Sequence, residues 1–79
     1  MAPELPEREI GRLVRERFRK GTLPMTDQAI PPAVRAKGTN ACIICGFTIS
    51  AGRNECGVLD GYAHEVCAVV WREESDRLL

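Results

Sequence analysis

The 79-residue sequence predicts one small domain, residues 1–79, of the α+β class. Three observations lead to this prediction. An apolar stripe of helical period lies near the N-terminus, turn-bounded segments of strand length follow residue 46, and a second helical segment comes last. A chain this short has too small an apolar core to be stable by itself, so we expect a metal ion or disulfides to support it.

The first predicted element is a helix over residues 6–20. Pro6 suits a first helical position and Gly21 suits a helix C-cap. One side of this helix carries an apolar stripe of Ile10, Leu13, Val14 and Phe18, and the other carries a basic face of Arg8, Arg12, Arg15 and Arg19. We expect the stripe to pack near Val70 and Trp71. The basic face is either a solvated surface or a docking surface for an acidic partner.

Residues 21–41 form a long connector, because prolines and glycines interrupt any regular element there. Two interpretations stay open at this point. The connector is flexible, or it wraps around the core through its apolar side chains, which are Leu23, Met25, Ile30 and Val34.

Residues 42–79 form the third part, a compact module. A tight turn at residues 42–46 is followed by two predicted strands, residues 47–49 and 55–59, which a turn-rich loop joins into a hairpin. A helix over about residues 62–78 completes the module. Its candidate core residues are Val66, Val70, Trp71 and Leu78.

Two pairs of potential metal ligands stand in this module, Cys42-x2-Cys45 and, after eighteen intervening residues, His64-x2-Cys67. Zinc favours four tetrahedral ligands of thiolate and imidazole type, and four protein ligands are typical of a structural site. The pattern therefore predicts one structural Zn²⁺ held by Cys42, Cys45, His64 and Cys67. A knuckle, a hairpin and a helix that share four ligands form a treble-clef-like, zinc-stabilised domain.

Cys56 is a fifth candidate ligand. An all-thiolate set that uses Cys56 in place of His64 is an alternative, but Cys56 has no second ligand at metal-binding spacing beside it. We interpret Cys56 as a small buried apolar residue.

The module resembles a group of small uncharacterised bacterial zinc-binding proteins with a CxxCG…I…G…E…HxxC…W pattern. The matching positions here are Cys42, Cys45, Gly46, Ile49, Gly52, Glu55, His64, Cys67 and Trp71, after a helix that ends in Gly21 to Pro24. The resemblance implies the same four ligands and a core role for Trp71, and it implies no enzymatic activity.

Charge is divided unevenly along a chain whose formal net charge is zero. Residues 1–40 carry eight Lys/Arg against five Asp/Glu (+3), and residues 41–79 carry three against six (−3). A broad basic field for nucleic acid is therefore absent. We expect a non-catalytic zinc-binding module that mediates protein–protein interaction, and not an enzyme, because the single histidine is used as a ligand.

The alternative is a zinc-finger regulator that acts on the transcription machinery or nucleic acid through the basic face. The zinc region is similar to that of DksA/TraR-type regulators, although His64 replaces a cysteine and prolines break the connector.

The expected location of the protein in the cell follows from its composition. The longest apolar run, residues 67–71, is too short for a membrane span, and residues 1–9 lack the apolar stretch of a signal peptide, so we expect a cytoplasmic protein.

Overall fold

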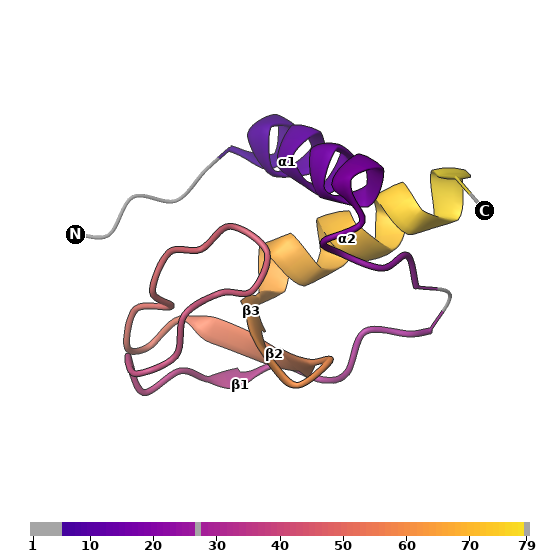
Figure 1. Cartoon of the computed structure of the whole chain (residues 1–79). Helices are drawn as coiled ribbons and strands as arrows, with labels where there is room; N and C mark the ends of the chain where they lie inside the picture. The colour runs from indigo at the N-terminus through magenta and orange to yellow at the C-terminus, as the bar shows by residue number, and fades with distance from the viewer. Residues whose placement is uncertain (1–5, 27, 79) are drawn as a thin grey trace.

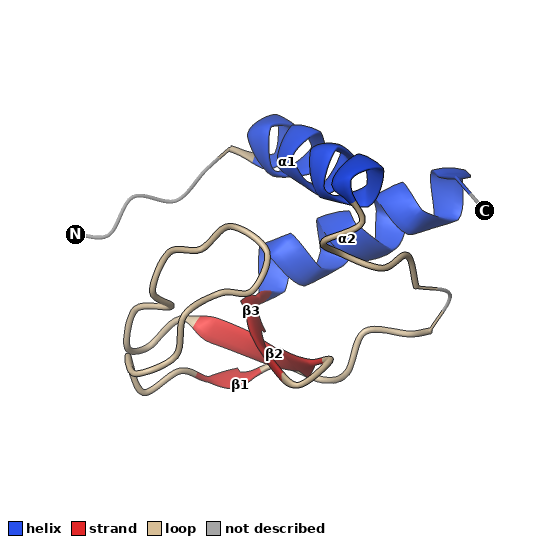
Figure 2. Cartoon of the chain, viewed as in Figure 1, coloured by secondary structure: helices blue, strands red, loops and turns tan. Residues whose placement is uncertain are grey.

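The computed structural model describes residues 6–26 and 28–78. Over this part of the chain it contains two helices and a three-stranded antiparallel sheet, which confirms the α+β class. The elements in order are α1 (Glu7–Lys20), β1 (Val34–Arg35), β2 (Asn54–Val58), β3 (Gly61–His64) and α2 (Glu65–Leu78). Helix α2 lies between α1 and the sheet, as Figures 1 and 2 show.

Helix α1 matches its prediction to within one residue, because Pro6 is the N-cap and not the first helical residue. The helix ends at Gly21, whose φ of 73° is the left-handed conformation that glycine adopts without strain. Three of the four stripe residues face inward as expected, whereas Leu13 is only half-buried and is not part of the apolar core cluster. Ile10 and Val14 are fully buried in one cluster with Val70 and Trp71, and Phe18 packs against that cluster.

The connector wraps around the core. Leu23 is buried, and Ile30 packs against the apolar cluster. The Trp71 indole Nε1 donates a 2.8 Å hydrogen bond to the Pro24 carbonyl, which ties the connector to α2. Of the four apolar side chains through which a wrapped connector would contact the core, Leu23 and Ile30 do so.

Two details of the connector prediction are wrong. Met25 and Val34 are exposed instead of buried. The connector also contains a strand, β1, where proline and glycine argued against regular structure. Val34 and Arg35 pair with residues 55 and 54 of β2, so the sheet itself gives this short segment its conformation.

The predicted hairpin is displaced along the chain. The hairpin partner of β2 is β3, whereas residues 47–49 make only an isolated bridge between Ala41 and Thr48. Ile49 is buried, and its backbone N–H donates to the Asn40 carbonyl, which folds this segment back on the turn at residues 42–46. Helix α2 consequently begins at Glu65, three residues after the predicted position. Neither described helix combines the length and apolar character that crossing a bilayer requires.

Candidate metal centre

The first half of the site is the turn at residues 42–46, called the knuckle below. The Gly46 N–H donates to the Cys42 carbonyl at 2.9 Å, and Gly46 has a φ of 83°, which closes the turn tightly. The backbone N–H groups of Ile44 and Cys45 both point at the Cys42 sulfur, at 3.4 Å. These bonds favour a thiolate at Cys42 and bring the Cys45 side chain alongside it.

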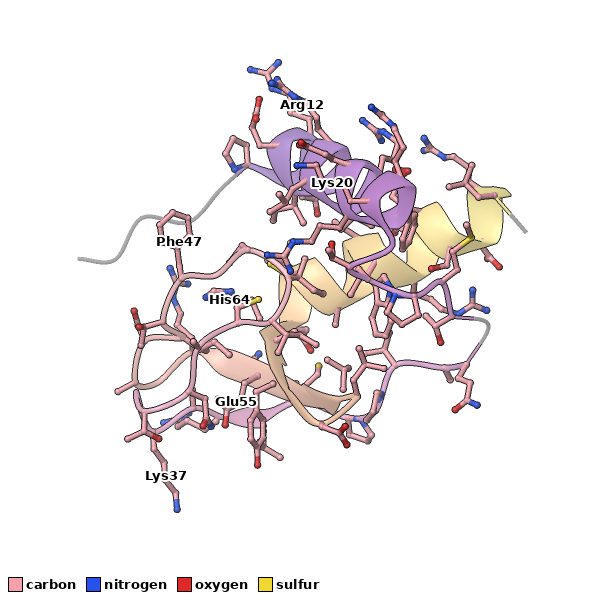
Figure 3. All side chains as sticks on the ribbon, in the orientation of Figure 1. Arg12, Lys20, Lys37, Phe47, Glu55 and His64 are labelled. Carbon is pink, nitrogen blue, oxygen red and sulfur yellow. The ribbon has the colours of Figure 1, made fainter. Side chains whose placement is uncertain are left out.

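The second half of the site lies where β3 meets α2. His64 is the last residue of β3, and Cys67 lies in the first turn of α2. Helical spacing alone therefore does not place the pair, because His64 precedes the helix. The knuckle reaches this junction through the Ile43 N–H, which donates to the Tyr62 carbonyl at 2.9 Å. Figure 3 shows His64 between the knuckle loop and the start of α2.

The structure brings together all four predicted ligands, Cys42, Cys45, His64 and Cys67, with their ligand atoms within 4.8 Å of one another. The His64 Nδ1 lies 3.4 Å from the Cys45 sulfur and 3.7 Å from the Cys67 sulfur. A tetrahedron with zinc–sulfur bonds near 2.3 Å and a zinc–nitrogen bond near 2.05 Å has a sulfur–nitrogen edge of about 3.6 Å. The observed distances lie on either side of that edge, so the residues fit one tetrahedral metal ion.

The protonation of the cluster follows from its hydrogen bonds. The Cys67 thiol donates to Cys42 and, together with nearby backbone N–H groups, lowers the pKa of Cys42 to about 4. The same bond raises the pKa of Cys67 far above its ordinary range. Burial raises the pKa of Cys45. A metal ion that binds these sulfurs must displace the protons of the thiols.

Cys56 lies outside this cluster. It is fully buried on β2, opposite Ala63 of β3, and burial raises the pKa of its thiol. The group that the structure assembles contains His64 in place of Cys56, in agreement with the preferred ligand set.

The basic face is only partly a solvated surface. Arg8, Arg12 and Arg19 are exposed, but the Arg15 guanidinium donates to a carboxylate oxygen of buried Glu74 on α2, at 2.9 Å. Arg15 therefore joins the two helices, because α2 brings an acidic residue to it that the helical period of α1 alone does not reveal.

One residue of the site was missed by sequence reasoning. The guanidinium of Arg17, on α1, donates to the carbonyl of Ile43 inside the knuckle. Its only sequence signal is its place at the edge of the apolar stripe, beside Phe18 and apart from the basic face.

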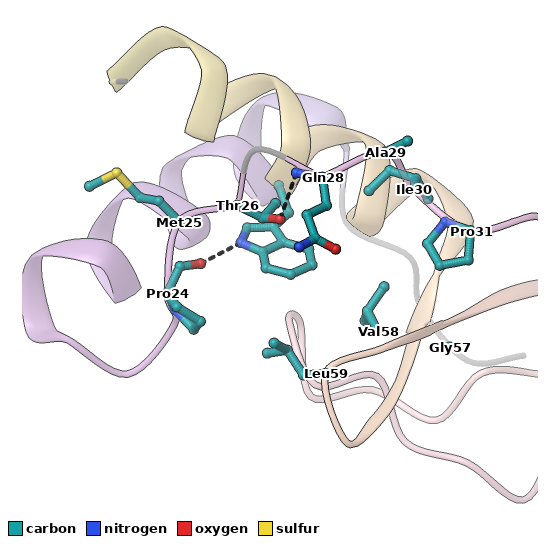
Figure 4. Close-up of a pocket in the computed structure, with 11 residues that line it drawn as sticks. Pro24, Met25, Thr26, Gln28, Ala29, Ile30, Pro31, Gly57, Val58 and Leu59 are labelled. Atoms are coloured by element: carbon teal, nitrogen blue, oxygen red, sulfur yellow. Dashed lines mark hydrogen bonds between the residues drawn. The ribbon is translucent and has the colours of Figure 1, made fainter.

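A separate groove of about 510 Å³ lies between the connector, α2 and the β2–β3 turn (Figure 4). The described residues that line it carry no ionisable side chain, so they supply no general acid or base. They are Pro24, Met25, Thr26, Gln28, Ala29, Ile30, Pro31, Gly57, Val58, Leu59 and Trp71.

Comparisons with protein-family models, with curated proteins and with solved structures returned no match.

Proposed function

We propose that this protein is a non-catalytic zinc-binding module, in which one structural Zn²⁺ holds the knuckle to the β3–α2 junction. The observation that carries this proposal is the Cys42, Cys45, His64 and Cys67 cluster, whose spacing fits a tetrahedral ion. Four protein ligands fill a tetrahedral shell, whereas a catalytic zinc keeps a position for water. Three thiolates and one imidazole favour zinc over harder ions such as Mg²⁺ or Ca²⁺.

The order of elements supports a treble-clef-like arrangement. A knuckle is followed by the β2–β3 hairpin and then by α2, with two ligands at the knuckle and two at the β3–α2 junction. A reduced, cytoplasmic setting suits this proposal, because no disulfide joins any of the four cysteines.

We further propose that the module acts by binding a protein with an acidic surface, through the exposed arginines of α1. Arg8, Arg12 and Arg19 lie on one side of the helix, and Arg12 is paired only at 3.9 Å with Glu9. Since Arg15 is held by Glu74, three guanidinium groups and not four are offered to a partner. The zero net charge of the chain favours a local protein contact over the broad phosphate contact that nucleic acid demands.

The metal proposal is tested by elemental analysis and by cobalt substitution. We expect one zinc per chain and a cobalt spectrum with thiolate charge-transfer bands in tetrahedral coordination. Cys67→Ser should lose the metal, and Cys56→Ala should keep it as a matched cysteine control. A chain that keeps its full circular dichroism spectrum and a sharp melting transition after chelation would refute the proposal.

The partner proposal is tested by capturing proteins from the source cell with the zinc-loaded chain. A triple variant with Arg8, Arg12 and Arg19 changed to serine should lose the captured partner, and changing Arg35 and Lys37, which are exposed and lie outside α1, to serine gives the control. Equal binding of the partner by both variants would show that the three arginines are only a solvated surface. A nucleic-acid partner would show itself by an affinity that falls steeply with salt.

A further inference from the structure

Helix α1 contributes no ligand to the cluster, yet one of its side chains reaches the metal site. The Arg17 guanidinium donates to the carbonyl of Ile43, 26 residues later in the chain. Figure 1 shows the loop before β2 rising toward α1, so the contact bridges the helical layer and the knuckle. Ile43 lies between the ligands Cys42 and Cys45.

The carbonyl that Arg17 contacts belongs to a peptide group that also serves a ligand. The Ile43 carbonyl and the Ile44 N–H are the two ends of one planar peptide unit. That Ile44 N–H donates to the Cys42 sulfur at 3.4 Å. A donor on the oxygen side of a peptide polarises its N–H and strengthens the bond that the N–H donates. The cationic side chain therefore acts on the sulfur through one rigid peptide group.

Charge reinforces this contact. A divalent ion with three thiolates and one neutral imidazole carries a net charge of −1, and a guanidinium stays protonated at all ordinary pH values. The positive side chain beside the knuckle is thus complementary to the metal-loaded site.

We propose that Arg17 is a positioning residue of the metal centre, which acts on the Cys42 thiolate through the Ile43–Ile44 peptide group. The inference rests on the proposed function, because it presumes that the cluster holds a metal ion. By thermodynamic reciprocity, the loaded knuckle strengthens the docking of α1 as much as Arg17 strengthens metal binding. The helix that carries the basic face is then held in place by the occupied metal site.

The test compares Arg17→Met with two control variants of α1. Arg19→Met removes the same charge from an exposed position of the same helix, and Val14→Ala weakens the packing of α1 without changing its charge. Zinc affinity is measured by competition with a chelator. The environment of the thiolates is measured from the cobalt charge-transfer bands and from the ¹¹³Cd chemical shift of the cadmium-loaded protein.

We expect Arg17→Met to lower zinc affinity by about tenfold, within the range for residues that support metal ligands indirectly. It should also shift the cobalt bands and the cadmium resonance. Arg19→Met should change neither the zinc affinity nor the two spectroscopic signals. Val14→Ala should lower affinity through lost stability but leave both spectroscopic signals in place. If Arg17→Met does not fold with metal, Arg17→Lys, which keeps the charge and a donor, should show smaller shifts in the same direction.

Unchanged spectra in both Arg17 variants, with an affinity loss no larger than that of Val14→Ala, would overturn the inference and leave the zinc proposal standing. A wild-type chain that binds neither zinc nor cobalt would instead overturn the zinc proposal itself.

Discussion

The ion pair between the two helices predicts an asymmetric response to mutation. The Glu74 side chain is 7% exposed, and one of its oxygens accepts a hydrogen bond from Arg15 at 2.9 Å and forms an ion pair with Arg77 at 3.5 Å. Among the described residues, its other oxygen is buried without a hydrogen-bond partner. Arg15, by contrast, is 44% exposed. Losing Arg15 leaves a carboxylate in the interior, whereas losing Glu74 leaves a guanidinium that water can reach.

The sizes of the two effects follow from this difference. Removing one partner of a fully buried pair costs about 3–5 kcal/mol. Arg77 compensates in part but is itself 72% exposed, so we expect Arg15→Met to lower the free energy of unfolding by about 2–3 kcal/mol. Glu74→Met removes both the charge and its unpartnered oxygen, and it should change stability by less than about 1 kcal/mol in either direction.

The assay is thermal unfolding followed by circular dichroism, with zinc saturating and at equal concentration for every variant. For a chain of this size, a loss of 2–3 kcal/mol lowers Tm by roughly 8–24 °C. Arg12→Met is the matched control, because Arg12 is 75% exposed and lies 3.9 Å from its partner, where such pairs contribute less than about 1 kcal/mol. If Glu74→Met destabilises the protein as much as Arg15→Met, the difference in burial between the two side chains does not determine the cost of losing each one.

Three further predictions follow from the site and its surroundings. Cys56→Ala should keep the metal and cost about 1–2 kcal/mol of stability, measured by denaturant unfolding, because it deletes one buried sulfur. Since the pKa values of Cys45 and Cys67 are raised, zinc binding should release thiol protons and weaken as pH falls; a titration that releases none would contradict this. Gly11→Ala should stabilise α1 by about 0.5–1 kcal/mol in the melting assay, since the added methyl meets its neighbours at 3.4 Å or more; a lower Tm would show that the helices cannot accommodate it.

The four ligand residues could be found from sequence because their chemistry and spacing are local. A Cys-x2-Cys turn closes by itself around Gly46, and its meaning does not depend on the rest of the fold. Arg17 could not be found in this way. Its role depends on where α1 lies relative to the knuckle, and that placement is set by packing between distant segments.

The strands also depend on contacts between distant segments, which limits how well sequence alone predicts them. The helical period of α1 is strong enough to fix its bounds to within a residue, whereas β1 is two residues long and exists only because β2 lies beside it. The sequence predicts that the last helix begins at about residue 62, whereas α2 begins at Glu65. Pairing with β2 keeps Tyr62 and His64 extended instead, since it satisfies their backbone groups in the sheet.

The contact between Arg15 and Glu74 also bears on how the chain is made. These residues are 59 positions apart, and at ribosomal speeds of 5–20 residues per second the second is added about 3–12 seconds after the first. Throughout that interval, the apolar stripe of α1 exists without the helix that covers it. Cys67 is then added shortly before Val70 and Trp71, the residues that cover the stripe. If the cluster binds a metal ion as proposed, its last ligand and the residues that close the core are therefore added within the same brief stage of synthesis.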